Sequence, residues 1–232
     1  MKSLPVSLSK TEFQRGLGLL LFGQFVLPSL LIELVSGLNL GFTSAQYNFL
    51  YFLINYVAAI ILFHKFIWAE LEVAFKKAFR ILGYLVICYG IYHLLSTGVA
   101  YLIHWIDPTF FNLNDANISD MSQQQFALIA VGTVILVPLA EEMLFRGVLF
   151  NHIYQKHHVL AWLISIVSFS LVHLIGYIGQ YSPLAFFLAF LQYLPASIVL
   201  CFGYVQSGTI FTPILFHTLI NAIAMYYQFA AR

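Results

Sequence analysis

The stretch FALIAVGTVILVPLAEEMLFRGVL occupies residues 126–149. It is long enough to cross the hydrocarbon core of a bilayer as a helix, which takes about 20 residues. Its only charged residues are Glu141, Glu142 and Arg146. The stretch therefore predicts a membrane-spanning helix with three ionisable side chains, each of which needs an explanation because charge is costly in lipid.

The rest of the chain has the same apolar character. Only 8% of its 232 residues are charged, whereas an ordinary soluble domain has about 25%. Hydrophobic residues make up 61% of the chain, and the mean hydropathy is +0.89. This composition excludes a cytosolic enzyme, a nucleic-acid-binding protein and a disordered chain. The expected surroundings are lipid, and no nucleic acid is expected as a partner.

Six more apolar stretches have the length of a spanning helix. The runs are continuous rather than alternating, so helices and not strands are expected to cross the bilayer. We predict an all-α, polytopic membrane helix bundle of about seven or eight transmembrane helices, folded as one integrated membrane domain. The predicted spans are 16–37, 46–64, 80–103, 126–149, 159–178, 183–204 and 208–229.

The distribution of lysine and arginine predicts the orientation. Loop 104–125 contains neither residue, only aspartates as charged groups. By the positive-inside rule the N-terminus is predicted in the cytoplasm. Short loops, no cleavable signal peptide and this orientation favour a bacterial cytoplasmic membrane. The basic residues expected on the cytoplasmic side are Lys2, Lys10, Arg15, Lys65, Lys76, Lys77, Arg80 and Lys156.

The three charged residues of 126–149 differ in what they can pair with. Glu142 and Arg146 stand four residues apart, the spacing of an acid–base pair on one helix face. Glu141 is rotated about 100° away and has no partner on its own helix. An unpaired carboxyl group in a low dielectric is suited to accept a proton in catalysis. The alternative is one buried ion network that only fixes helix packing.

Two later spans carry further polar groups. Phe169 and His173 share one face of the span 159–178, and His217 and Asn221 share one face of the last span. If these helices meet, Glu141 and His173 can activate a water molecule. His217 and Asn221 can then donate hydrogen bonds to the oxyanion that forms on a carbonyl.

The same side chains leave a metal site open as an alternative. Glu141, His173 and His217 are ligand types that Zn²⁺ accepts. No two of them form a compact motif on one helix, so spacing does not decide between the two chemistries. By simple helical rise, Glu141 is expected toward the inner side of its span and His173 toward the outer side of the next. For these residues to meet, the predicted helix boundaries must shift by about one turn, or the two helices must be offset.

The polar positions form three motifs, Glu-Glu-x-x-x-Arg, Phe-x-x-x-His and His-x-x-x-Asn, in this order and on separate helices. Together they resemble the CPBP family of intramembrane proteases, also called Abi, which covers CAAX prenyl endopeptidases and bacteriocin-processing or immunity proteins. The resemblance covers residues 126–226 as a catalytic core, preceded by N-terminal helices and loops over 1–125. The positions that carry it are Glu141, Glu142, Arg146, Phe169, His173, His217 and Asn221.

The resemblance implies an endopeptidase that acts within the membrane. It assigns water activation to Glu141 and His173, and the oxyanion hole to His217 and Asn221. Glu142, Arg146 and Phe169 then support these groups. A glutamate-activated water needs no metal or other cofactor, and we favour this over the zinc alternative.

The substrate is expected to be a peptide or a membrane-protein segment within the bilayer. Prenylated CAAX substrates are not typical of bacteria, so a bacteriocin leader is a more plausible target. The alternative from another class is a non-enzymatic immunity or interaction protein that keeps the motifs as a scaffold. A proton-coupled transporter is a third possibility, because intramembrane Glu and His also serve proton relays.

Overall fold

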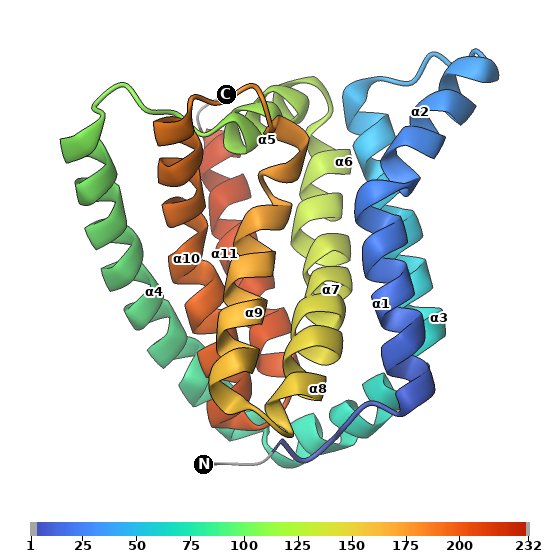
Figure 1. The fold of residues 1–232 in the computed structure, drawn as a ribbon, viewed down its shortest axis with the longest axis vertical. Helices are drawn as coiled ribbons and strands as arrows, with labels where there is room; N and C mark the ends of the chain where they lie inside the picture. Colours follow the sequence, from blue (N-terminus) through green and yellow to red (C-terminus); the bar gives the residue numbers. More distant parts are fainter. Residues whose placement is uncertain (1–3, 231–232) are drawn as a thin grey trace.

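The computed structural model describes residues 4–230, and it contains helices and no β-strand over that range. The expected all-α class is confirmed, with the long helices lying side by side (Figure 1). The α-helices are α1 (Lys10–Phe25), α2 (Leu27–Gly37), α3 (Ser44–Lys76), α4 (Ala78–Ile106), α5 (Leu113–Gln124), α6 (Phe126–Val131), α7 (Val137–Glu142), α8 (Asn151–Tyr154), α9 (His158–Val172), α10 (Pro183–Ser207) and α11 (Phe211–Ala230). Two π-helical segments, η1 (Gly132–Leu136) and η2 (Met143–Phe150), and a 3₁₀ turn, η3 (Ile175–Tyr177), complete the set.

Within residues 4–230, four helices are long and apolar enough to cross a membrane: α3, α4, the continuous segment Phe126–Tyr154 and α10. A fifth is counted if α1 and α2, which are bent by 52° against each other, form one span. The chain is thus a multi-pass membrane protein by the length and composition of its helices. The expected count of about seven or eight spans is not confirmed. The helix expected over 159–178 ends at Val172, and the backbone beyond it turns.

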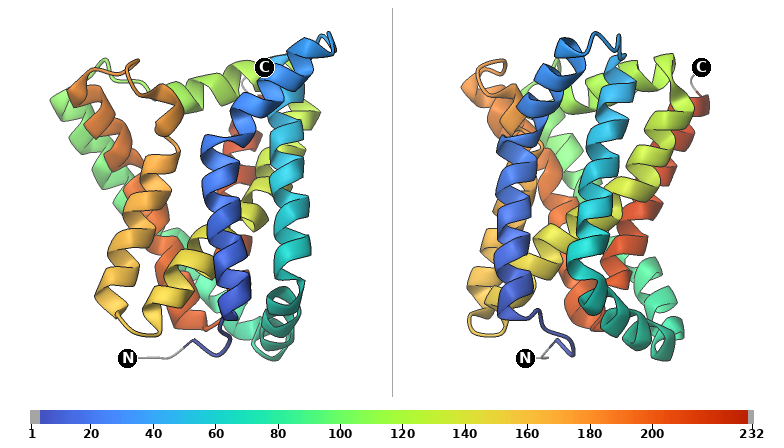
Figure 2. Two further views of the ribbon diagram at one scale, coloured as in Figure 1. Left: turned by 45° about the vertical axis from the view of Figure 1, so that its right-hand side comes forward. Right: turned by 90° about the vertical axis from the view of Figure 1, so that its right-hand side faces the viewer.

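The bundle has two distinct ends (Figures 1 and 2). The start of α1, the connection between α8 and α9 and the last part of α3 lie at one end, which we call the N-terminal end. Helix α5 crosses the opposite end, which we call the α5 end. Helix α4 is tilted relative to the neighbouring helices, and its separation from them increases toward the α5 end (Figure 1).

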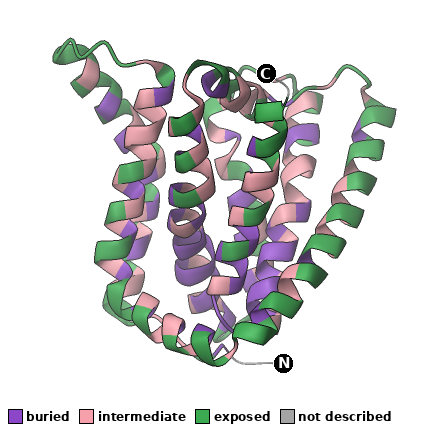
Figure 3. Ribbon diagram, turned by 180° about the vertical axis from the view of Figure 1, so that it is seen from behind, coloured by how far each residue is buried: buried purple, intermediate pink, exposed green. Residues whose placement is uncertain are grey.

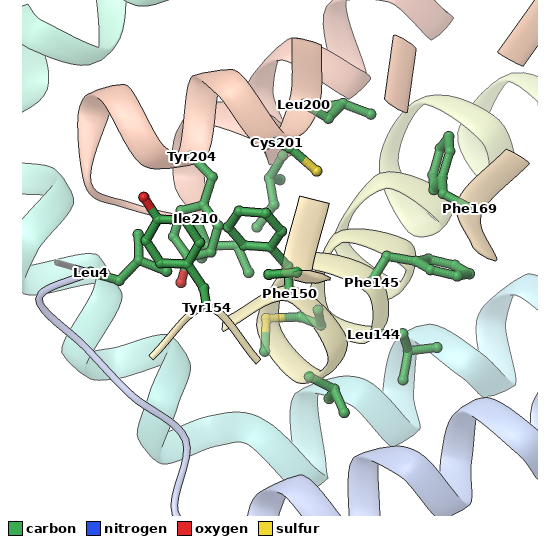
Figure 4. Close-up of a cluster of buried hydrophobic side chains, with 14 of the residues drawn as sticks. Leu4, Leu144, Phe145, Phe150, Tyr154, Phe169, Leu200, Cys201, Tyr204 and Ile210 are labelled. Atoms are coloured by element: carbon green, nitrogen blue, oxygen red, sulfur yellow. The ribbon is translucent and has the colours of Figure 1, made fainter. Parts of the chain in front are cut away.

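The hydrophobic core lies among the central helices, while α4 is largely exposed (Figure 3). Aromatic rings fill the core (Figure 4). Phe150 stacks on Tyr154 with ring centroids 4.9 Å apart, and Phe145 meets Phe169 edge to face at 5.3 Å. Offset and edge-to-face pairs are the favoured arrangements of aromatic rings. The Phe145–Phe169 contact joins η2 to α9, and the Phe150–Tyr154 contact lies between η2 and α8.

Two π-helical segments flank α7, which carries both glutamates. The N–H of Val137 donates to the carbonyl of Gly132, and the N–H of Asn151 donates to that of Arg146. Each bond spans five residues and makes a wider turn than the four-residue bond of an α-helix. Pro138 is the second residue of α7 and has no N–H to donate. The wide turns therefore set the direction in which α7 presents its side chains.

A buried carboxylate at the N-terminal end fixes the start of α11. Glu70 of α3 is fully buried, and its Oε2 accepts a hydrogen bond of 3.0 Å from the N–H of Ile210. Its Oε1 lies 3.4 Å from the hydroxyl of Tyr204, which also accepts 2.7 Å from Asn151 Nδ2. Helix α11 carries two of the candidate site residues. Glu70 therefore ties α3 to the turn that positions them.

Replacing Glu70 with alanine should lower the stability of the folded protein. The N–H of Ile210 would then remain buried without an acceptor, at a cost of about 1–3 kcal/mol. The measurement is the thermal unfolding midpoint of the purified protein. Glu72→Ala is the matched control, since Glu72 lies on the same helix but is exposed. Equal midpoints for the two variants would contradict this role for Glu70.

Candidate active site

Glu141 and His173 face each other across the contact between α7 and the end of α9. Glu141 Oε2 lies 4.0 Å from His173 Nε2, and the side chains are 21% and 17% exposed. The expected difference in depth between them is wrong. The helical segment that carries Glu141 continues to Tyr154, and α9 starts at His158. Glu141 and His173 are therefore separated from the turn between the two helices by nearly the same number of residues.

The imidazole of His173 is held in one orientation. Its Nδ1 lies 2.8 Å from the carbonyl oxygen of Phe169, which can only accept, so Nδ1 carries the proton. Nε2 is then the unprotonated nitrogen, and it is directed at Glu141. The ring also stacks on that of Tyr193, with centroids 4.4 Å apart. Two contacts besides Glu141 therefore fix the ring.

Glu142 and Arg146 form the pair that their spacing predicts. Arg146 Nη1 donates to Glu142 Oε1 at 3.1 Å, and both side chains are fully buried. The guanidinium also donates to the carbonyl and the hydroxyl of Ser197, each at 3.2 Å. It lies 4.2 Å from the centroid of the Phe169 ring, in a cation–π arrangement. These contacts join η2, α9 and α10 behind the site.

His217 and Asn221 both make contacts that sequence reasoning did not foresee. His217 Nδ1 lies 3.0 Å from Glu142 Oε1 and donates to it, because a carboxylate only accepts. Asn221 Nδ2 donates to the carbonyl oxygen of Thr133 at 2.8 Å. One donor of each side chain is therefore already in use. Asn221 keeps a second amide proton, whereas His217 can donate again only when Nε2 also carries a proton.

A cavity of about 730 Å³ lies at this site, in the half of the bundle nearer α5, and residues of α5 and of the α4–α5 connection line it. Four candidate catalytic residues and Phe169 line it, whereas Glu142 and Arg146 lie behind its wall. No lysine or arginine among residues 4–230 lines it. The candidate residues that meet in the cavity are Glu141, Phe169, His173, His217 and Asn221.

Within the described part of the chain, two buried carboxylate oxygens have no hydrogen-bond partner, Oε2 of Glu142 behind the cavity wall and Oε2 of Glu141 at the cavity. Glu141 Oε2 is buried and makes no hydrogen bond with the protein. At 4.0 Å from His173 Nε2 it is too far for a direct hydrogen bond but within reach of a bridging water. The separation between the carboxylate oxygen and the imidazole nitrogen is therefore one that a single water molecule can bridge.

The alternative metal ligands do not converge. Glu141 and His173 approach each other, but the Nδ1 of His217 is turned to Glu142. Among residues 4–230, no three His, Cys, Asp or Glu side chains form a group that could hold a metal ion.

Sequence reasoning missed several polar residues of the cavity. Asn114 and Asp115 lie on α5, which was read only as part of a polar loop, and they line the cavity. Gln192 and Tyr193 of α10 also line it. Their position in a predicted span was a usable signal, because polar groups inside a span need hydrogen-bond partners.

Comparison with known proteins gives one match. The family model described as "Type II CAAX prenyl endopeptidase Rce1-like" matches residues 123–223. This segment contains all three motifs, and the match confirms the family resemblance that they indicate. Neither the curated proteins nor the solved structures searched gave a match to the chain.

Proposed function

From the match of residues 123–223 to the Rce1-like family, we propose that the protein is an intramembrane endopeptidase that hydrolyses peptide bonds with a water activated by Glu141 and His173. The observation that carries this proposal is the unpartnered Glu141 Oε2, which lies 4.0 Å from His173 Nε2 in a cavity large enough for a peptide segment. A general base must lie within hydrogen-bond reach of the proton that it abstracts, directly or through one water.

The first step uses the two facing acceptors. A water between them donates one hydrogen to Glu141 and is oriented by His173 Nε2. Its oxygen attacks the carbonyl carbon of the scissile bond while the proton passes to the Glu141 carboxylate. The carbonyl oxygen becomes an oxyanion. Glu141 then returns the proton to the departing amine nitrogen as the C–N bond breaks, which leaves an acid and an amine as products.

The oxyanion needs donors on the opposite side of the carbonyl. Asn221 donates one amide proton to the Thr133 carbonyl. Its second amide proton remains for the oxyanion at any pH, because a side-chain amide does not lose its protons. His217 contributes when both ring nitrogens carry protons, with Nδ1 held by Glu142. Fixed donors aimed at a developing negative charge stabilise the transition state at little cost in reorganisation.

Metal chelation should leave the activity unchanged. The protein is reconstituted in lipid vesicles with a mixture of apolar synthetic peptides, and cut sites are identified by mass spectrometry. Peptides are expected to be cleaved equally with and without a chelator, because Glu141 and His173 alone supply the water activation. Loss of cleavage that added zinc restores would overturn the metal-free mechanism.

A chain that cleaves no peptide would instead point to a binding role. The physiological substrate of the proposed enzyme is a bacteriocin leader or a membrane-protein segment. Cells that express the protein can be challenged with a bacteriocin in parallel. Protection that survives substitution of both Glu141 and His173, without any cleavage, would favour an immunity protein over a protease.

The membrane orientation is part of the proposal. Lys10 starts α1, Lys76 and Arg80 flank the α3–α4 junction, and Lys156 follows α8, so these residues all belong to the N-terminal end (Figure 1). We assign this end to the cytoplasm of a bacterial cell by the positive-inside rule. Helices α9 and α11, which run alongside the longer helices, are proposed to cross with them, giving about seven spans.

A further inference from the structure

Helix α5 is fastened to α10 by side-chain amides. Asn112 Nδ2 donates to Gln192 Oε1 at 3.2 Å, and Asn114 Nδ2 donates to the Tyr193 hydroxyl at 3.0 Å. Asn112 also caps the start of α5, since its Oδ1 accepts from the N–H groups of Asn114 and Asp115. The first turn of α5 therefore holds a fixed position at the cavity.

Asp115 extends from this fixed turn into the cavity. Its Oδ2 accepts 2.9 Å from Gln192 Nε2, and its Oδ1 lies 3.4 Å from the Tyr193 hydroxyl. The side chain is exposed, but to the cavity that it lines and not only to the outer surface. A carboxylate has about four acceptor sites, and these two bonds leave the others open. Asp115 thus has the capacity to accept further donors from a bound molecule.

The charge of the cavity is one-sided. Asp107, Asp115 and Glu141 line it, and within the described range 4–230 no lysine or arginine does. Asp115 takes part in no ion pair with a lysine or arginine among residues 4–230. A negatively charged cavity with low-dielectric walls attracts and holds cations.

Asp115 lies one aromatic ring away from the candidate catalytic histidine. The Tyr193 hydroxyl contacts Asp115, while the ring of Tyr193 stacks on His173 at 4.4 Å. A group bound by Asp115 would therefore lie close to the scissile bond. Desolvation by the surrounding cavity wall raises the pKa of Asp115, and the hydrogen bonds from Tyr193 and Gln192 partly offset this shift. An incoming cation would act in the same direction as these hydrogen bonds and favour the charged carboxylate.

We propose that Asp115 forms a subsite for a cationic group of the peptide substrate, an arginine or lysine side chain next to the scissile bond. This inference rests on the proposed endopeptidase activity and specifies its substrate class. The carboxylate supplies the charge, the bonds from Gln192 and Tyr193 aim it, and the apolar parts of the cavity wall accept the aliphatic stem of the side chain.

The test uses a series of short leucine–alanine peptides, each of which carries a single arginine at a different position. A matching set carries citrulline, which has the shape of arginine without its charge. Binding is measured by fluorescence with the Glu141→Gln protein, so that the peptides stay intact. At one position the arginine peptide should bind about tenfold more tightly than its citrulline counterpart. In Glu141→Gln/Asp115→Asn this ratio should fall to about one, and Asp115→Glu in the same background should retain it.

Cleavage by the protein with Glu141 intact, scored by mass spectrometry, separates this inference from the proposed function. Cut sites should lie at a constant distance from the arginine, and Asp120→Asn should not alter them, since Asp120 is exposed and does not line the cavity. An arginine preference without any cleavage would support the subsite and refute the protease. Cleavage without an arginine preference, a preference that survives Asp115→Asn, or an equal loss for both peptide sets would overturn the subsite.

Discussion

Glu141→Gln should abolish peptide cleavage and leave the folded protein intact. Glutamine keeps the size of glutamate but cannot take a proton from water, so the general base is lost. General acid–base catalysis typically contributes about 10²–10⁴ in rate, and the loss of cleavage should be of that size. The fold should survive because Glu141 Oε2 makes no hydrogen bond that the substitution would break.

The measurement is the cleavage rate in lipid vesicles, with folding checked by the thermal unfolding midpoint. Glu33→Gln is the matched control, because Glu33 is a second glutamate in an apolar helix but is exposed and lies outside the cavity lining. The control should cleave at the wild-type rate. Full activity of Glu141→Gln would exclude Glu141 as the base and with it the mechanism proposed here.

Glu142→Gln, in contrast to Glu141→Gln, should cause a large loss of stability of the folded protein. Arg146 and Glu142 are both fully buried, and the substitution leaves the guanidinium without a counter-charge. Breaking a buried ion pair by removing one partner costs about 3–5 kcal/mol. The side chain is also the acceptor for His217, so the substitution weakens the contact that orients this imidazole.

The yield of folded protein and its thermal unfolding midpoint measure this effect. Arg146→Gln in the Glu142→Gln background provides the decisive comparison, because it removes the stranded charge. The double variant should recover part of the lost stability, since two neutral groups are less costly to bury than one charge. Wild-type stability of Glu142→Gln alone would show that the pair does not hold the helices together.

The sequence predicted the contacts that lie on one helix better than those between helices. Glu142 and Arg146 pair as expected because four residues bring two side chains to the same face whatever the rest of the fold does. The meeting of Glu141 and His173 depends on where two helices end, and helix boundaries are the least reliable part of sequence analysis. The π-helical turns on either side of α7 have no periodicity signal that sequence reasoning could use.

Asp115 and Glu70 show that local sequence patterns also fail to predict the environment of individual carboxylates. Asp115 lies in a segment whose polarity predicts a solvated loop, yet it forms part of α5 and lines the cavity. Glu70 lies near lysines that predict an exposed helix end, yet it is fully buried. In both cases tertiary hydrogen bonds, and not local composition, decide the environment. Such bonds join residues far apart in the chain, so no local sequence pattern predicts them.

Lys10, Lys76, Arg80 and Lys156 lie at the N-terminal end of the bundle, whereas the cavity lies in the half nearer α5. In the proposed orientation the cavity is therefore on the side of the membrane away from the cytoplasm, and the water consumed in each turnover would enter from outside the cell. A polypeptide would reach Glu141 only after its segment has been exported or inserted. Newly made chains in the cytoplasm would thus be spared, and the topology of the bundle itself would decide when in a substrate's life it is cut.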